Sequence, residues 1–360
     1  MKSPGEDLII RMWETVEKVG CGFLAPWQAR RMGRANALAQ RDTTLLLAQT
    51  ERDVAALKDG TARLDHSGAA PRICHTTETR GNGAQPTGRV EPSFASTGMV
   101  DRALGAAAAE ALSAEVNRTK ALFHAESWLA NQFTPAPEAS VDSDWLEAWR
   151  VNAGRTSAEQ MQRLWGRVLA GEVAAPNTYS LRTLDFLRTL SKSEADDIAR
   201  LAPLVVEDTV PSDFPSLHNE RGVGSSLLIR LQAIGLLSGV GGISIGRRYT
   251  PGVLREVAFR TVGHHIVVRW NNESLTTPQV DLNGFRLTPL GVELMRLCEV
   301  EPDVEFAEAF AQSLADKHLD VTLCSLELGP DGKERRINCR VLKNRLSELL
   351  RQHSSASQQD

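Results

Sequence analysis

The sequence has few lysines, few aromatic residues and no paired cysteine motif. Lysine occurs 8 times against 33 arginines, and aromatic residues make up 5% of the 360 positions. The cysteines are odd in number and scattered, with no C-x-x-C pair, which excludes a disulfide-built miniprotein and a cysteine-rich zinc site. We therefore expect five reduced thiols: Cys21, Cys74, Cys298, Cys324 and Cys339.

The chain also lacks a long apolar run. The longest stretch without charge lies between Arg230 and Arg247 and is short and rich in glycine, whereas a membrane-spanning helix needs about 20 apolar residues. No basic stretch followed by an apolar core follows Met1, so no signal peptide is visible. We expect a cytoplasmic protein without an integral membrane segment.

The overall composition is that of an ordinary globular protein. Hydrophobic residues make up 42% and charged residues 24%, and the net charge is −4. These values exclude a collagen, a fully disordered chain and a histone-like polycation. The length predicts two or three folding units.

Apolar spacing predicts helices through most of the first half. They cover residues 6–19, 27–58, 101–132, 142–151, 157–170 and 181–190. Gly171 is expected to end the helix over 157–170, and Ser180 and Ser193 have the character of N-caps. Residues 60–98 are rich in glycine and proline and poor in apolar residues, which predicts a flexible linker or insertion.

The second half mixes helices with short strands. A helix over 225–237 precedes expected strands at 243–245, 265–270 and 282–287 and a helix over 288–297. This order resembles a winged-helix module, a likeness of fold that does not assign a function. The remaining expected elements are a helix over 303–315, strands at 319–328 and 335–339, and a closing helix over 341–351.

The sequence thus predicts a mainly α fold with a smaller α+β part, in which a helical N-terminal region and core precede a winged-helix-like C-terminal half. The expected divisions are a helical N-terminal region (1–59), the flexible insertion (60–98), a helical core (99–210), a winged-helix-like module (211–300), a small α+β end (301–352) and a disordered tail (353–360).

The segment 142–204 carries the most specific pattern. Its distinctive residues, in chain order, are Trp145, Trp165, Gly171, Glu172, Ser180 and Arg182. In this respect the segment resembles the bacterial family known as domain of unknown function 2806. Asn177 departs from the glycine expected after Pro176, although both residue types tolerate a left-handed backbone.

The resemblance implies a family without a settled activity, whose related proteins look like components of phage-defence or abortive-infection neighbourhoods. The motif residues themselves suggest a scaffold. Trp165 lies among apolar residues and is expected in the core, and Glu172 is expected either to accept backbone N–H groups or to pair with Arg182. We therefore assign these residues a structural role.

Four catalytic or ligand-binding patterns fail in context. Ser244 lies in G-x-S-x-G, but no strand–turn–helix elbow surrounds it, and the glycines near it are not followed by G-K-S/T. His124 begins H-x-E without the P-C-x-x-C half of a zinc deaminase. His264 and His265 are neighbours on an expected strand, where they would point to opposite faces. We assign no catalytic residue, metal or cofactor.

Clusters of arginine are the remaining candidates for binding. Arg30, Arg31 and Arg34 share one expected helix, and Arg247 and Arg248 fall where a wing would lie. A third basic cluster occupies 333–345. Such clusters can contact phosphates or a partner, but in an arginine-rich protein they are also typical of a solvated surface.

Three hypotheses follow for function. The leading one is a non-enzymatic interaction or sensor module, with phage defence as its setting and a protein, self or other, as its partner. The alternative is a winged-helix protein that binds nucleic acid through Arg247 and Arg248. The third is a hydrolase or nuclease of a type that the sequence does not reveal.

Overall fold

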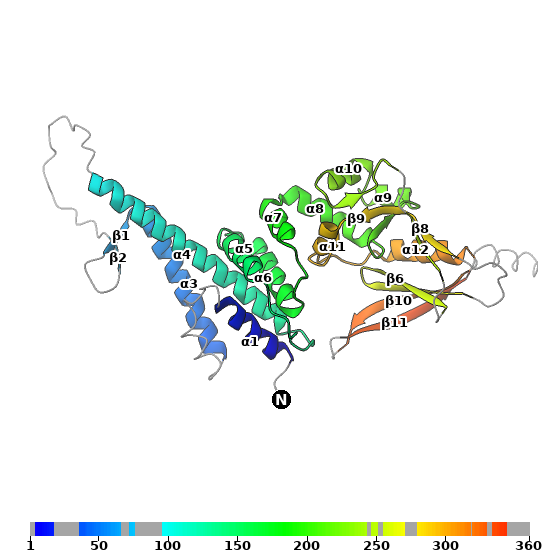
Figure 1. The fold of residues 1–360 in the computed structure, drawn as a ribbon, viewed down its shortest axis with the longest axis horizontal. Coiled ribbons are helices and arrows are strands. Elements are labelled where there is room, and N and C mark those ends of the chain that lie inside the picture. Colours follow the sequence, from blue (N-terminus) through cyan, green and yellow to red (C-terminus); the bar gives the residue numbers. More distant parts are fainter. Residues whose placement is uncertain are drawn as a thin grey trace, which may run out of the picture. The chain divides into compact units, whose positions relative to one another are not determined.

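The structure is a computed structural model (Figure 1). It describes residues 4–17, 36–65, 72–75, 96–242, 246–250, 255–270, 279–317, 319–329 and 333–343. The chain forms two compact units, Met1–Asn177 and Thr178–Asp360. Each unit is described by itself below. The division falls inside the range 99–210, for which we expected one core.

Helices build most of the first unit. Its helices are α1 (Pro4–Glu17), α3 (Asn36–Lys58), α4 (Ser96–Leu129), α5 (Ser143–Gly154) and α6 (Glu159–Ala174). The long helix α4 packs against all four of the others. The mixed fold with helices dominant agrees with the sequence expectation.

The closest helix contact in this unit depends on a glycine. A Cβ at Gly166 of α6 would lie 2.7 Å from the carbonyl oxygen of Ala121 in α4, so any side chain there would force the helices apart. The indole N–H of the fully buried Trp149 donates to the carbonyl oxygen of Trp165 at 2.9 Å, which joins α5 to α6.

We expected a flexible linker or insertion over residues 60–98, and this expectation is wrong for part of the range. Strands β1 (Ala62–Asp65) and β2 (Arg72–His75) pair there as an antiparallel hairpin. Leu64 and Ile73 pack against a small buried cluster that α3 and α4 complete. The cluster consists of Val54, Leu57, Ala62 and Ala109. A few apolar residues suffice because two helices supply the other half of the core.

Two expected helix boundaries are also wrong. Helix α6 runs through Gly171 to Ala174, and Ala175 is extended, as the residue before Pro176 prefers to be. The next N-cap after α7 is Ser191 and not Ser193. Ser191 and Glu194 form a capping box, in which each side chain satisfies the other's backbone N–H.

The second unit begins with helices and a short strand. These are α7 (Leu181–Thr189), α8 (Lys192–Leu201), a 3-10 turn (Ala202–Leu204), β3 (Thr209–Pro211) and α9 (Pro215–Glu220). Helix α7 packs against α11, which comes about a hundred residues later. The boundary between the two units follows Asn177, between α6 and α7.

A small three-stranded sheet follows. Helix α10 (Ser225–Ala233) leads into β4 (Leu237–Ser238), and β9 (Gly284–Leu287) leads into α11 (Pro289–Met295). The strand order is β3-β9-β4, antiparallel throughout. A Cβ at Gly284 would lie 2.1 Å from the carbonyl oxygen of Val210 in the neighbouring strand, so this position requires glycine.

A two-stranded ribbon lies between β4 and β9 in the sequence. It pairs β5 (Arg247–Tyr249) with β8 (Val280–Leu282). The strand expected over 282–287 is thus two strands, which belong to two different sheets and are separated by Asn283.

The largest sheet has four antiparallel strands in the order β11-β10-β7-β6. They are β6 (Glu256–Thr261), β7 (His264–Arg269), β10 (Asp320–Leu328) and β11 (Glu334–Leu342), and α12 (Val304–Ala315) packs on one face. Aromatic rings join the two layers, among them Phe214, Phe259, Phe306 and Phe310.

The expectation of five reduced thiols is wrong for two of them. Cys324 and Cys339 form a disulfide between β10 and β11. The two strands shift register between Leu323 and Ser325, which brings together two cysteines that lie 15 positions apart in the sequence. Cys74 and Cys298 are not part of a disulfide.

Several predictions fall outside the described residues. They concern 27–35 of the long second helix, 66–71 and 76–95 of the insertion, the strand at 243–245, the closing helix beyond Lys343 and the tail. No helix in the described ranges is both long and apolar enough to cross a membrane.

Candidate functional site

The motif residues of the first unit stabilise a turn. Glu172 is 2% exposed, and its carboxylate accepts the backbone N–H of Asn177 at 2.6 Å. Asn177 has a φ of 69°, the left-handed conformation that asparagine tolerates better than most residues. Arg182 is exposed. The first of our two alternatives for Glu172, acceptance of a backbone N–H, is observed, and a pairing with Arg182 stays a prediction.

Ser180 belongs to a second polar cluster. It is the N-cap of α7, and the Glu293 carboxylate of α11 accepts both its backbone N–H at 2.7 Å and its hydroxyl at 3.0 Å. The Thr183 hydroxyl donates to the same carboxylate oxygen at 2.5 Å. A negative charge at a helix N-terminus is stabilising, and this one joins α7 to α11.

The motif tryptophans lie in the core. Trp165 is 1% exposed and Trp145 is 4% exposed. Neither indole N–H has a hydrogen-bond partner within the described part of the chain. Both rings therefore contribute apolar packing rather than polar recognition.

The arginines of the expected wing are paired within their own unit. Arg248 lies 2.8 Å from the Asp281 carboxylate across the β5–β8 ribbon. Arg247 lies 3.7 Å from Asp208 and places its guanidinium 5.5 Å from the centre of the Tyr249 ring. Their positive charge is thus partly compensated before any ligand arrives.

The exposed arginine of α10 is also paired with an acid of the same unit. Arg230 donates twice to the Asp197 carboxylate of α8, at 2.7 and 3.1 Å, and Ile229 beside it is 55% exposed. The other arginine candidates of the sequence, Arg30, Arg31 and Arg34, lie outside the described residues.

The histidine candidates do not form a metal site. His264 is buried and His265 is half-buried, on opposite faces of β7. Burial and the neighbouring Arg336 lower the pKa of His265, and its Nδ1 lies 3.1 Å from the Arg336 Nε donor. No group of three or more metal-ligating side chains occurs in the described ranges.

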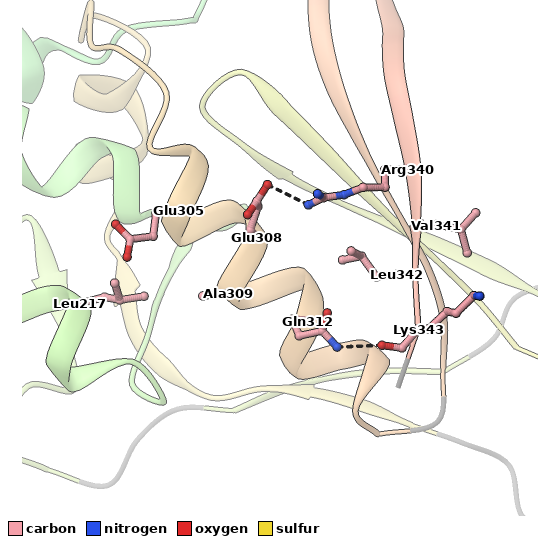
Figure 2. A pocket seen from close by; sticks show the side chains of 9 residues that line it. All are labelled: Leu217, Glu305, Glu308, Ala309, Gln312, Arg340, Val341, Leu342 and Lys343. Atoms are coloured by element: carbon pink, nitrogen blue, oxygen red, sulfur yellow. Dashed lines mark hydrogen bonds and ion pairs between the residues drawn. The ribbon is translucent and has the colours of Figure 1, made fainter. Parts of the chain in front are cut away.

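A groove between α12 and β11 forms a concave site in the second unit (Figure 2). Its volume is about 550 Å³. The lining residues are Leu217 of α9, Glu305, Glu308, Ala309 and Gln312 of α12, and Arg340, Val341, Leu342 and Lys343 at the end of β11.

Two contacts hold the groove in shape. Arg340 pairs with Glu308 at 2.7 Å, and the Gln312 side chain donates to the carbonyl oxygen of Lys343 at 2.9 Å. Figure 2 shows Arg340 and Leu342 directed toward α12, with Val341 on the other side of the strand. The lining combines apolar side chains with charged side chains of both signs.

The groove adjoins an open sheet edge. Strand β11 pairs with β10 on one side, and no described strand pairs with its other side. Val341 is 67% exposed. At the opposite edge, by contrast, the N–H and the carbonyl oxygen of Arg260 in β6 are both bonded to Glu207: the N–H to its carboxylate at 2.7 Å and the oxygen to its backbone N–H at 2.9 Å.

The sequence indicated the basic cluster at 333–345 but not its position on a strand at the edge of a sheet. The expected strand ended at 339, whereas β11 reaches Leu342. The alternation of Arg340, Val341 and Leu342 could have indicated the longer strand. Nothing local in the sequence indicates that this strand lies at an edge, because its position depends on the pairing of β10 with β7, which comes from an earlier part of the chain.

The family resemblance of the middle segment is confirmed. The model of the family described as protein of unknown function, DUF2806, matches residues 124–220. This segment includes all six motif residues and extends through α9, whereas α12 and β11 lie beyond it. Residues 124–220 are thus a DUF2806 segment. None of the curated proteins and none of the solved structures matches the chain.

Proposed function

We propose that the chain is a non-enzymatic interaction module that binds a protein partner at the open edge of β11 and the α12–β11 groove. One observation carries the proposal: a nine-residue edge strand, unpaired on one side among the described residues, lies directly beside a groove whose lining includes Leu217, Ala309 and Leu342.

This arrangement suits a protein better than a small substrate. An edge strand offers a row of backbone donors and acceptors that an extended peptide can satisfy. The two acids of the groove, Glu305 and Glu308, pair with Arg221 and Arg340, and its lining residues include no histidine, thiol or hydroxyl group that would suggest chemistry on a bound molecule.

The biological setting is part of the proposal. Phage defence in a bacterial cytoplasm is supported by the family resemblance. The Cys324–Cys339 disulfide removes the cysteine-based argument for the cytoplasm, because disulfides are rare there.

A photo-reactive amino acid at Val341 tests the proposal. In cells that naturally produce the protein, we expect a discrete cross-linked protein adduct from this position. The matched control is the same substitution at Ile229, which is similarly exposed at 55% but lies on α10. Adducts at Ile229 alone, or no adduct at Val341, would contradict the assignment of the site.

Nucleic-acid binding is a second candidate, favoured by the topology. Helices α9 and α10 lie between β3 and β4 in the sequence, and β9 lies between these strands in the sheet. This order resembles that of a winged helix and supports the candidate. The β5–β8 ribbon with Arg247 and Arg248 would then be the wing.

Binding of fluorescent single- and double-stranded DNA and RNA at two salt concentrations tests this candidate. If the ribbon contacts phosphates, the variant Arg247→Ala/Arg248→Ala binds more weakly and shows a flatter salt dependence. Arg163→Ala is the control, because Arg163 is an exposed arginine that is also paired with an acid, in the first unit. Equal binding by both variants would exclude the ribbon as the contact.

A further inference from the structure

We infer that the occupant of the β11 edge is an acidic, extended segment of another protein. It adds to the sheet as a fifth strand and places one apolar side chain in the α12–β11 groove. This inference rests on the proposed function and specifies the chemistry of the partner.

The two edges of the sheet differ in the way that this mode of binding requires. At β6, Glu207 occupies both backbone groups of Arg260, so an added strand would have to displace it. At β11, no backbone group of the outer side bonds to another described strand. Beside β11 an incoming strand therefore displaces no described strand, although the Lys343 carbonyl oxygen already accepts a hydrogen bond from Gln312.

A bulge selects the part of β11 that a strand can use. Asn338 has a φ of 49°, and the pairing with β10 shifts register beside it. Such a bulge bends a strand and interrupts its ladder. The run from Arg340 to Lys343 is regular, and the groove lies beside it (Figure 2).

The groove fits an apolar side chain of the added strand. Side chains of a strand alternate between the two faces, so every second residue of the incoming segment would point to the α12 side. There the groove presents Leu217, Ala309 and Leu342.

Charge favours an acidic segment. The strand and its flanks carry five cations against the single acid Glu334, and Lys343 forms no ion pair within the described residues. The cations are Lys333, Arg335, Arg336, Arg340 and Lys343. Opposite charges across paired strands stabilise the pair, and like charges destabilise it.

The same charges disfavour a second copy of this chain. In a two-fold antiparallel pair centred on Asn338, Arg336 of one copy would face Arg340 of the other, and Lys333 would face Lys343. Each strand brings a net positive charge to any other register as well. Charged edge strands commonly prevent self-association in this way.

Fluorescent peptides of about nine residues, which is a usual strand length, test the inference on the full chain. One probe alternates Glu and Val, and a second alternates Lys and Val. We expect the Glu–Val peptide to bind at least about tenfold more tightly, which corresponds to about 1.4 kcal/mol. N-methylation of every second amide, which removes the strand-pairing donors, should abolish binding of the Glu–Val peptide.

Variants locate the site. Ala309→Leu fills the groove from α12 and should weaken the Glu–Val peptide at least about tenfold, whereas Ala111→Leu on the exposed surface of α4 should have no effect. Amide exchange provides a second readout: binding should slow exchange in β11 and leave β6 unchanged, which also reveals any variant that fails to fold.

The outcomes separate the inference from the proposed function. Equal binding of the two peptides, undiminished binding of the N-methylated peptide, or no binding at about 1 mM would overturn the acidic-strand inference. If the cross-link at Val341 still forms in that case, the interaction site stands and its partner has another chemistry. If the cross-link is absent too, both fail.

Discussion

The two edges of the four-stranded sheet show opposite solutions to the same physical problem. An edge strand exposes unpaired backbone groups that attract other strands. At β6 the chain closes this edge with Glu207, a non-glycine residue with a φ of 57° in the tight turn from Val206 to Thr209. At β11 the described chain provides no such closure and instead places cations along the strand.

The difference between the two edges coincides with the extent of the DUF2806 match. The closing residue Glu207 lies inside the DUF2806 segment, and the open edge lies outside it. Within that segment, polar groups such as Glu172 and Ser180 are bonded to the protein's own backbone and side chains. The surface that we propose for binding is formed mainly by α12 and β11, beyond the matched segment, and Leu217 of its lining lies within 124–220.

Loss of the disulfide is expected to have the largest effect on this comparison. Replacing Cys324 and Cys339 by Ala should lower the free energy of unfolding of the second unit by about 3 kcal/mol, the value for a loop of this length. Denaturant unfolding with and without dithiothreitol measures the change, since reductant should affect the wild type and not the variant.

Amide exchange shows whether the loss is confined to the open edge. We expect faster exchange along β11 and little change along β6. A uniform acceleration through all four strands would mean that the disulfide stabilises the whole sheet and not this edge.

Opening the closed edge is expected to have the next largest effect. Glu207→Ala removes the carboxylate that accepts the Arg260 N–H, at a cost of about 1 kcal/mol. Alanine keeps the left-handed backbone, which is strained for residues with a Cβ. Glu207→Gly removes the same bond without the strain and should be less destabilising. If the two variants are equally stable by thermal unfolding, the backbone conformation of Glu207 contributes nothing.

The free energy of unfolding of the second unit should depend on pH through a buried histidine. His218 of α9 is 4% exposed and packs on Phe306 of α12, and burial lowers its pKa below the usual 6.5. The unfolded chain therefore binds this proton more readily than the folded chain. The contribution to stability is complete above pH 6.5 and is lost as the pH falls toward the lowered pKa.

The variant His218→Met, which preserves volume, isolates this contribution. Its free energy of unfolding should fall less steeply than that of the wild type as the pH decreases below 6.5. The pKa values of His124 and His265 are also lowered by burial. Both residues are present in the wild type and in the variant, so their contributions cancel when the two pH profiles are compared. Parallel pH profiles would show that His218 does not titrate differently on folding.

The smallest effect is expected for the ion pair between Arg260 of β6 and Glu334 of β11. Both side chains are more than one third exposed, so Arg260→Gln should change the stability by at most about 0.5 kcal/mol. A double-mutant cycle with Glu334→Gln measures the coupling. A coupling well above 1 kcal/mol would show that the two edges are linked across the sheet.

Local chemistry accounts for the parts of this fold that the sequence predicted. The apolar spacing of α1 and α12, the Ser180 N-cap and the burial of Trp165 follow from residues close to one another in the chain. The helix end at Ala174 and the capping box at Ser191 were missed although their signals, a following proline and a Ser-x-x-Glu pattern, are equally local.

The remaining features depend on pairing between distant residues. The Cys324–Cys339 bond depends on a register shift between β10 and β11, and the closure of β6 depends on Glu207, which lies 53 residues before Arg260. A single sequence contains no periodicity that indicates such pairs. The α12–β11 groove could not be predicted for the same reason.

The Glu293 cluster also has a consequence for the order of synthesis. The cap of α7 is complete only when a carboxylate 113 positions later than Ser180 has reached it. During translation, α7 therefore leaves the ribosome well before α11 does, with the hydroxyls of Ser180 and Thr183 still facing water. The first helix of the second unit must wait for nearly a third of the chain before its final contacts can form, so this unit completes its fold late in synthesis.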